Sequence, residues 1–239
     1  NPSHLEIVHP VVRCSVRARQ QRRGDHDGTE VMPVILHGDA AFSGQGVVME
    51  SLNMSHKRVF SNCGGIHIFI NNQFGFTRSD PRDTRSSLYC TDVAKMIDAP
   101  VLHVNADDPE AALLAIEFAL DYRREFRKNI IIDLVCFRRH GHNEQDEPAV
   151  TQPLMYHKIA KHSGTRALYA DKLAVEKVVN ETEAADMVST YRAQLENDAR
   201  IVPPALSLYK PAYSTNCKAH RDIDWQHPSA TSLPLLHPQ

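Results

Sequence analysis

The sequence predicts an α/β fold with a doubly wound, mostly parallel sheet, followed by a helical C-terminal extension and an irregular tail. Four short apolar runs have the length of strands: residues 31–37, 65–71, 101–105 and 130–137. Three of them are apolar almost throughout, which is typical of parallel strands that are covered on both faces. Helical patterns lie between the runs, and alternating strands and helices indicate a wound α/β sheet.

Three helices are expected between the strands, at residues 46–57, 92–98 and 109–128. The third has the clearest ends. Asp108 suits the N-cap position and Pro109 the first helical position. Basic residues in the last turns complement the negative end of the helix dipole. These signals predict a long helix between the third and fourth strands.

The character of the chain changes after Gln152. Residues 153–162 and 171–197 are amphipathic with helical spacing, and from residue 203 the sequence is rich in Pro, Ser and His. Such a composition is typical of a linker or a wrapping arm. We therefore expect an α/β domain at residues 1–165, a helical extension at 166–200 and a Pro-rich linker or tail at 201–239.

Composition narrows the classes of partner. The 239 residues suffice for one good core, and the net charge of −2 argues against a general nucleic-acid or anionic-membrane partner. No apolar run approaches the roughly 20 residues of a membrane span, and no signal or transit peptide is recognised. Five cysteines without a CxxC pair favour a reducing compartment.

One basic cluster stands out in a polar stretch near the start of the chain. It consists of Arg17, Arg19, Arg22 and Arg23. Acidic residues follow it closely, namely Asp25, Asp27 and Glu30. This pattern favours a solvated loop with balanced charge.

Polar signatures follow the first two strands. Asp39 ends the first, in the string HGDAA at 37–41, and SGQG at 43–46 then leads into a helix. Asn72 ends the second, in the string INNQ at 70–73. Glycines let a backbone approach a ligand, and free N–H groups at a helix start favour an anion such as diphosphate. Ligands of open α/β sheets gather at the carboxyl ends of strands, so both side chains are expected near one point.

The oxygens at these strand ends suit Mg²⁺. Asp39 would supply a carboxylate, Asn72 an amide oxygen and Phe74 its main-chain carbonyl, and Mg²⁺ completes its octahedron with phosphate oxygens and water. Alternatively, Asp39 caps the next helix and Asn72 makes a turn. Their pairing at matching strand ends, with glycine-rich flanks, favours the ligand hypothesis.

Several longer strings are more specific. They are NPSHLE at 1–6, HGDAAFSGQG at 37–46, SLNMS at 51–55, NNQFGFT at 71–77, HVNADDPE at 103–110, GHNEQDEP at 141–148 and TQPLMY at 151–156. Together they resemble the decarboxylating component of the 2-oxoglutarate dehydrogenase complex. The resemblance covers about residues 1–173, in order and with plausible gaps.

The resemblance implies the thiamine-diphosphate-binding fold, with thiamine diphosphate and Mg²⁺ as cofactors. It makes Asp39, Asn72 and the Phe74 carbonyl the metal ligands. Ala40 stands where the general thiamine motif has its second glycine, and this branch commonly has alanine there. His4 matches an active-centre histidine near the reacting carbon, and His142 one that lies beside the diphosphate. A zinc site at His140 and His142 would need two further ligands.

The implied reaction is oxidative decarboxylation of 2-oxoglutarate, with succinyl transfer to a lipoyl group on a partner acyltransferase, a step of the tricarboxylic acid cycle. The activating glutamate of this family comes from a second α/β domain, which nothing here matches. We therefore expect the chain alone to be inactive, either a fragment or a subunit needing a complementary polypeptide. The complete enzyme is expected to be a homodimer, in a bacterial cytoplasm or a mitochondrial matrix.

Three alternatives remain at this point. A 2-oxoadipate dehydrogenase is a close sister, and a non-catalytic scaffold could retain the fold. A nucleotide-binding Rossmann protein would require GxGxxG, and only Gly44-Gln45-Gly46 is present. Separately, Asp133 lies inside an apolar strand, where a structural hydrogen bond is expected. Glu50 and Asn53 could face the cofactor or pack.

Overall fold

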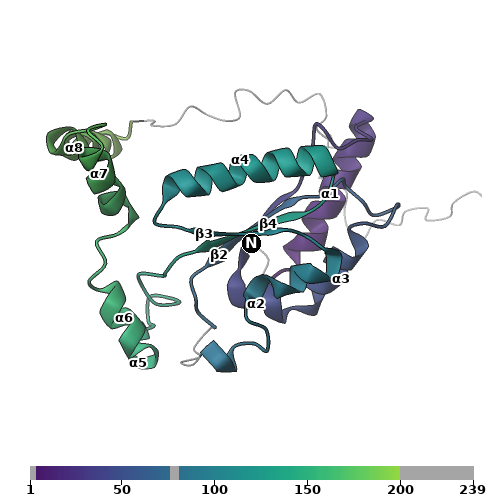
Figure 1. The fold of residues 1–239 in the computed structure, drawn as a ribbon, viewed down its shortest axis with the longest axis horizontal. Helices are drawn as coiled ribbons and strands as arrows, with labels where there is room; N and C mark the ends of the chain where they lie inside the picture. The colour runs from purple at the N-terminus through teal and green to yellow at the C-terminus, as the bar shows by residue number, and fades with distance from the viewer. Residues whose placement is uncertain (1–3, 76–80, 200–239) are drawn as a thin grey trace, which may run out of the picture. The chain divides into compact units, whose positions relative to one another are not determined.

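The computed structural model describes residues 4–75 and 81–199, drawn in colour in Figure 1. The chain divides into two compact units, Asn1–Ala193 and Gln194–Gln239. All four described strands belong to the first unit. In the second, residues 194–199 include the last turn of helix α8 (Glu181–Glu196). The predicted tail at 201–239 lies outside the described residues.

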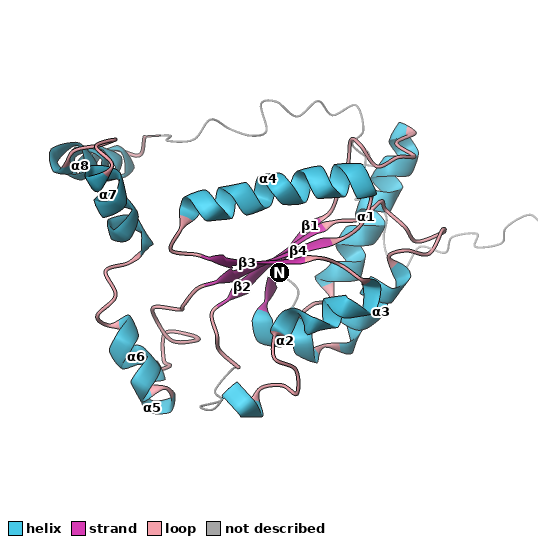
Figure 2. Cartoon of the chain, in the orientation of Figure 1, coloured by secondary structure: helices cyan, strands magenta, loops and turns pink. Residues whose placement is uncertain are grey.

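The strands form one sheet whose members all run parallel (Figure 2). They are β1 (Val34–Gly38), β2 (Ile66–Asn71), β3 (Val101–Asn105) and β4 (Ile130–Val135), in the order β1-β2-β4-β3. The predicted α/β fold with a parallel sheet is confirmed. The first strand begins three residues later than expected because Val31 donates its N–H to Asp25 at 3.1 Å and Pro33 has no N–H.

Helices cover both faces of the sheet, with α4 (Pro109–Phe126) on one side and α2 (Asp39–Gly44) and α3 (Gly46–Met54) on the other (Figure 1). Alternation along the strands divides the apolar residues between two cores. Ile66, Ile130 and Ile132 pack with Ala115 and Ala119 of α4. The second core lies beneath α2, α3 and the 3₁₀ segment Cys90–Ile97, and contains Phe42, Val48, Leu52, Phe69 and Ile131. Burying each large side chain contributes about 1.5–3 kcal/mol.

The long helix α4 begins as predicted. The Asp108 carboxylate accepts a hydrogen bond from the N–H of Ala111 at 3.1 Å, and Pro109 occupies the first turn. The helix ends at Phe126, two residues before the predicted end, because Arg127 adopts a left-handed conformation with φ 55°. The predicted helix at 46–57 ends earlier, at Met54, and that at 92–98 is the 3₁₀ segment Cys90–Ile97.

The basic cluster is wrongly predicted as a loop, because it lies on helix α1 (Val8–Arg23). One face of α1 is buried, but that face is largely polar: His9, Arg13, Val16 and Gln20. The Gln20 amide donates to the carbonyls of Val31 (2.8 Å) and Asn62 (3.1 Å). Hydropathy could not reveal this helix, because three of the four buried residues are polar and an apolar stripe is therefore missing from the sequence.

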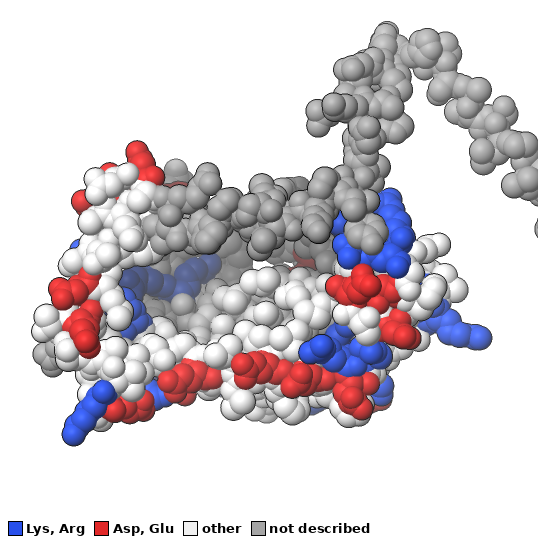
Figure 3. Space-filling model, turned by 90° about the horizontal axis from the view of Figure 1, so that it is seen from above, with Lys and Arg blue, Asp and Glu red and all other residues white. Residues whose placement is uncertain are grey.

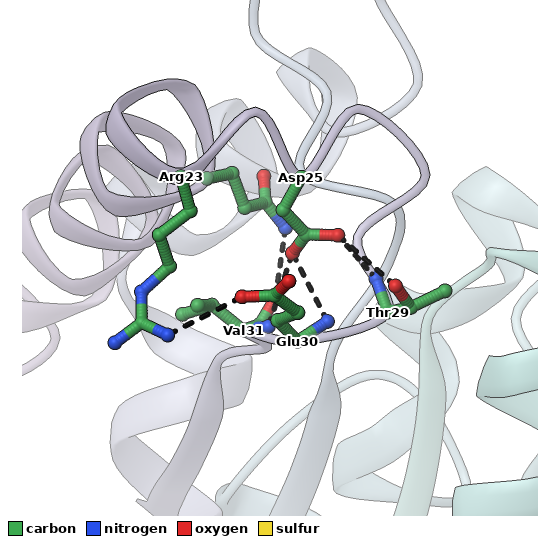
Figure 4. Close-up of polar contacts among 6 residues, drawn as sticks. Arg23, Asp25, Thr29, Glu30 and Val31 are labelled. Carbon is green, nitrogen blue, oxygen red and sulfur yellow. Dashed lines mark hydrogen bonds and ion pairs between the residues drawn. The ribbon is translucent and has the colours of Figure 1, made fainter.

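Asp25 closes the connection between α1 and β1 (Figure 4). Gly24 ends the helix in the left-handed region, and the buried Asp25 carboxylate then accepts from the N–H groups of Thr29 (2.7 Å), Glu30 (3.1 Å) and Val31 (3.1 Å). Of the acidic residues expected to balance the basic cluster, Glu30 does pair with Arg23, at 3.3 Å. Asp25 instead serves the backbone of the turn.

Replacing Asp25 with alanine is expected to lower the free energy of unfolding by about 2 kcal/mol, because backbone donors lose a charged acceptor. Burial acts to raise the pKa of Asp25, but the hydrogen bonds from Thr29, Val31 and Glu30 outweigh it and hold the pKa below its ordinary value. The stabilisation is therefore present above the unfolded pKa of about 3.9 and is lost as the pH falls below it.

Urea unfolding at pH 7 and at pH 3 measures this effect. The difference in the free energy of unfolding between Asp25→Ala and the parent chain should be smaller at pH 3. The exposed Asp27 in the same turn supplies a matched control, Asp27→Ala, with a change within about 0.5 kcal/mol. Equal stability losses in the two variants would contradict the assignment.

Between the sheet and residue 199, the structure has four helices: α5 (Pro148–Thr151), α6 (Pro153–Ile159), α7 (Thr165–Val175) and α8. The single helix predicted at 171–197 is wrong, because Lys177 has φ 59° and separates α7 from α8. A capping box precedes α8. Asn180 Oδ1 accepts from the N–H of Glu183, and Glu183 Oε2 accepts from the N–H of Asn180, each at 2.8 Å. The sequence carried this signal.

The start of the helical extension is tied to the loop after β3. The Asp107 carboxylate contacts His162 Nε2 at 2.9 Å and accepts from Thr165 Oγ1 at 2.7 Å. Glu110 accepts from the Tyr169 hydroxyl at 3.1 Å and pairs with Lys172. The predicted division of the extension at residues 166–200 stays a prediction.

Charged side chains of both signs share the face drawn in Figure 3. Acidic side chains run along one edge, basic ones gather near both ends, and uncharged residues lie between them. The basic side chains visible there therefore form no continuous surface. In the described part of the chain, no helix is both long and apolar enough to cross a membrane.

Candidate functional site

Asp39 and Asn72 leave the same edge of the sheet from neighbouring strands. β1 and β2 pair directly and in parallel, with Gly38 opposite Ile70. Asp39 follows Gly38 at once, and Asn72 follows the last residue of β2. The predicted adjacency of these two strand ends is confirmed, because parallel neighbours end at one edge.

A cavity of about 400 Å³ opens at this edge. Its lining contains every residue that the sequence singled out for the site: His4, Asp39, Ala40, Asn72, Phe74 and His142. Sequence reasoning did not predict the other contributors, which include Leu5, Glu6, Leu36 and Arg138. Segments far apart in the chain thus meet around one hollow. Their roles toward a ligand stay predictions.

Asp39 is a buried carboxylate at the first position of α2. Gly38 occupies the N-cap in extended conformation and no side chain caps the helix, so the structure gives the capping alternative for Asp39 no support. Burial raises the pKa of Asp39, while N–H groups at the start of α2 and the charge of Arg85 act to lower it. A carboxylate under this desolvation is stabilised by a cation at its oxygens.

Asn72 and Phe74 form a tight turn beside this carboxylate. The Asn72 amide oxygen accepts from the N–H of Phe74 at 3.2 Å, so the turn alternative for Asn72 is correct. An amide oxygen has two lone pairs, which leaves one for a metal. Phe74 is buried, with Arg138 4.9 Å above its ring and the Tyr156 ring at 5.8 Å. These contacts hold the Phe74 backbone in place.

This donor set fits Mg²⁺ in company with phosphate. It comprises one carboxylate, one amide and one carbonyl oxygen, and Mg²⁺ is usually held by one or two carboxylates with phosphate oxygens and water. Across residues 4–75 and 81–199, no three His, Cys, Asp or Glu side chains are arranged to hold a metal ion. The zinc alternative at His140 and His142 therefore has no further ligands in that part of the chain.

His142 lies in a loop that folds around Asp146. The Asp146 carboxylate accepts from the His142 N–H at 2.7 Å, and His142 Nδ1 lies 3.3 Å from the Arg138 guanidinium. A Cβ on Gly141 would lie 2.3 Å from the Asp146 carbonyl, so only glycine fits this approach. His4, on the segment before α1, also lines the cavity.

Asp133 has the structural partners that the sequence predicts. Its carboxylate is 1% exposed and accepts from Asn71 Nδ2 at 2.9 Å and His103 Nδ1 at 2.7 Å. The first of these bonds supports β2 immediately before Asn72. Glu50 and Asn53 are both exposed on α3, and neither lines the cavity.

Sequence reasoning missed a set of buried side chains behind the cavity. His37 Nδ1 lies 2.7 Å from Glu6 Oε2, and His37 Nε2 lies 2.9 Å from His67 Nδ1. His9 packs edge-on against both imidazoles. Burial lowers the pKa of His9 to about 3, and it lowers the pKa of His67 well below the ordinary value, so both rings are neutral. A histidine inside the apolar run of β2 was the available signal.

Comparison with known proteins gives consistent matches. Residues 2–208 match the family model of the dehydrogenase E1 component. The 2-oxoglutarate dehydrogenase E1 component of Cupriavidus necator is 54% identical over 235 residues, covering 98% of this chain and 25% of the relative. That of Azotobacter vinelandii is 58% identical over 202 residues, covering 84% of this chain and 21% of the relative.

A mitochondrial relative matches as well. The 2-oxoglutarate dehydrogenase of Caenorhabditis briggsae is 49% identical over 197 residues, which cover 82% of this chain and 19% of the relative. The chain thus spans a quarter or less of the length of these three curated relatives.

Proposed function

This chain belongs to the dehydrogenase E1 component family, and on that premise we propose that it forms the Mg²⁺- and diphosphate-binding side of the site in a thiamine-diphosphate-dependent 2-oxoglutarate dehydrogenase. One observation carries the proposal. Asp39, Asn72 and Phe74, at the ends of two adjacent parallel strands, share one cavity with two histidines. A metal-bound diphosphate needs such hard oxygen donors.

Each residue then has a role. Asp39, Asn72 and the Phe74 carbonyl would hold Mg²⁺, while Ala40 and His142 would lie beside the diphosphate. When bound, thiamine diphosphate supplies the electron sink for decarboxylation. His4 would donate a hydrogen bond to the 2-oxo acid near the reacting carbon, where negative charge develops. The protein's contribution is to hold these groups in position before the reaction.

The substrate proposed is 2-oxoglutarate. The relatives from Cupriavidus necator, Azotobacter vinelandii and Caenorhabditis briggsae all carry 2-oxoglutarate dehydrogenase names. The acyl group would pass to a lipoyl-bearing acyltransferase, as succinyl transfer in the tricarboxylic acid cycle. A complementary domain would supply the activating glutamate, and the complete enzyme would be a homodimer. Turnover of 2-oxoglutarate and of 2-oxoadipate by the complete E1 component separates the two sister activities.

Calorimetric titration of the complete E1 component with thiamine diphosphate tests the proposed site. Binding is expected with Mg²⁺ present and is expected to fall at least about tenfold when the cation is chelated. Thiamine without phosphate is the control, because it has no oxygens to share with the metal. Cation-independent binding of thiamine diphosphate would overturn the proposed metal role, and no binding at all would favour the non-catalytic scaffold.

The isolated 239-residue chain is expected to show no decarboxylation of 2-oxoglutarate above the buffer rate, because the activating glutamate has no match in it. The measurement is CO₂ release with thiamine diphosphate, Mg²⁺ and an artificial electron acceptor. Adding the complementary part of the E1 polypeptide should restore turnover. Measurable turnover by the chain alone would show that it needs no second domain.

A further inference from the structure

Three side chains form a hydrogen-bonded chain that begins at Glu6 in the cavity lining and runs inward, and we call it the Glu6–His37–His67 chain. Its two links measure 2.7 Å and 2.9 Å. Each member belongs to a different segment: Glu6 to the turn before α1, His37 to β1 and His67 to β2. These segments carry His4, Asp39 and Asn72 respectively. The hydrogen bonds therefore join the three parts of the chain that supply the proposed site.

The link between Glu6 and His37 is buried. The Glu6 side chain is 6% exposed and that of His37 is fully buried. Phe42 and Phe69 pack against the His37 ring at 4.9 Å and 5.1 Å. If one partner is removed, water has little access to replace it, and the other is left with a buried unsatisfied polar atom. The bond is thus a strong restraint on the segment that bears Glu6.

The backbone at Glu6 shows the same restraint. Its φ is 65°, in the left-handed region that residues with a side chain rarely adopt. Such a conformation persists where surrounding contacts hold it. Here the carboxylate is held by His37, and the Glu6 carbonyl accepts at 3.0 Å from the N–H of His9 in the first turn of α1. His4 lies two residues before this anchored point.

We propose that Glu6 and His37 are positioning residues, whose hydrogen bond holds the His4 segment against the end of β1 and so sets where His4 stands relative to Asp39. The inference deepens the proposed function and rests on it. The competing explanation is that the pair only fills the core. A filler would affect stability throughout the domain, whereas a positioning bond affects residues 4–8 and the reaction.

Two substitutions at His37 distinguish the contact made by its Nδ1 from the contact made by its Nε2. The amide nitrogen of asparagine reaches the place of Nδ1, so His37→Asn keeps a donor toward Glu6. The amide of glutamine reaches the place of Nε2, so His37→Gln keeps the contact with His67 and loses that with Glu6. Ile35→Val is the matched control, because it trims a buried side chain of the same strand without touching the link.

Hydrogen exchange on the 239-residue chain gives a readout that needs no cofactor. In His37→Gln, the amide of His9, which donates to the Glu6 carbonyl, is expected to exchange at least about tenfold faster, with residues 66–69 of β2 unchanged. In His37→Asn the exchange of the His9 amide should stay close to that of the parent chain. If hydrogen exchange became faster to the same degree throughout the sheet and the first segment in both His37 variants, the pair would only fill the core and the proposal would be overturned. Ile35→Val shows the exchange pattern of such a general loss of packing.

Kinetics of the complete E1 component give the second readout. His37→Gln is expected to lower kcat about 10- to 100-fold with the affinity for Mg²⁺–thiamine diphosphate within about twofold, because His4 is displaced while Asp39 and Asn72 remain on their strands. His37→Asn should recover most of that loss. If His37→Gln does not fold, Glu6→Ala against Glu6→Gln makes the same comparison from the other partner.

His4→Ala distinguishes a failure of the proposed role of His4 from a failure of the positioning role of Glu6 and His37. If it keeps full kcat, the role of His4 in the proposed function fails. If it loses activity while His37→Gln and Glu6→Ala keep theirs, the proposed function stands and the positioning role is overturned.

Discussion

Replacing Asp39 with alanine is expected to weaken the binding of Mg²⁺–thiamine diphosphate by more than about a hundredfold, since losing even an outer partner of a metal site costs about 10- to 100-fold. Asp39 is the only carboxylate in the proposed donor set, so the variant removes all of the set's negative charge. The remaining amide and carbonyl oxygens are neutral, and they would hold a cation only through its phosphate and water ligands.

The same variant should fold as stably as the parent chain or more so. Burial raises the pKa of Asp39, which means that the folded chain destabilises the carboxylate. Titration calorimetry of the complete E1 component, with thermal unfolding of the 239-residue chain in parallel, tests both halves. Asp39→Asn is the matched variant, because it keeps an oxygen and the shape but loses the charge, and its affinity should fall between the other two. If Asp39→Ala bound Mg²⁺–thiamine diphosphate with unchanged affinity, the proposed metal site at this edge of the sheet would be contradicted.

Replacing Arg123 with methionine is expected to lower the free energy of unfolding by about 3 kcal/mol, because buried carbonyls lose their donor. Arg123 lies on α4, is 2% exposed and donates from Nε to the Gly64 carbonyl at 3.3 Å. Its terminal nitrogens donate to the carbonyls of Gly28 and Asn62. One guanidinium thus joins α4 to two turns at the far end of the sheet from the site.

Methionine keeps the apolar stem of the side chain out to the place of Nε and removes the hydrogen-bonding guanidinium group. Arg124→Met is the matched control on the next residue of the same helix, where the side chain is exposed, and it should change stability by less than about 0.5 kcal/mol. Urea unfolding followed by circular dichroism measures both. Equal losses in the two variants would show that the buried hydrogen bonds contribute nothing beyond helix propensity.

Local signals predicted the parts of the fold whose cause is local. The N-cap of α4 at Asp108 follows from the preferences of single positions, and the strands follow from apolar runs of short length. The elements that sequence reasoning missed have other causes. Helix α1 buries polar side chains, and two of them, Arg13 and Gln20, donate hydrogen bonds to residues of the following turn and of the segment before β2. The break between α7 and α8 does have a local signal in the sequence, the Asn180–Glu183 capping box.

The candidate site divides in the same way. The residues that follow β1 and β2 were predictable, because the ends of parallel strands and their glycine-rich flanks are visible in the sequence. The Glu6–His37–His67 chain was not predictable, because it joins residues from three separate segments. Only His67, a histidine within an apolar run, is unusual in its own segment.

The sequence by itself determined the α/β class, the parallel strands and the identity of the residues at their ends, since short-range patterning and motif strings carry that information. Only the tertiary structure decided that His4 and His142 line one cavity with Asp39 and Asn72, and that a buried hydrogen bond ties the first segment to β1. The physical reason is that such meetings depend on packing between segments far apart in the chain, whose geometry no local pattern contains.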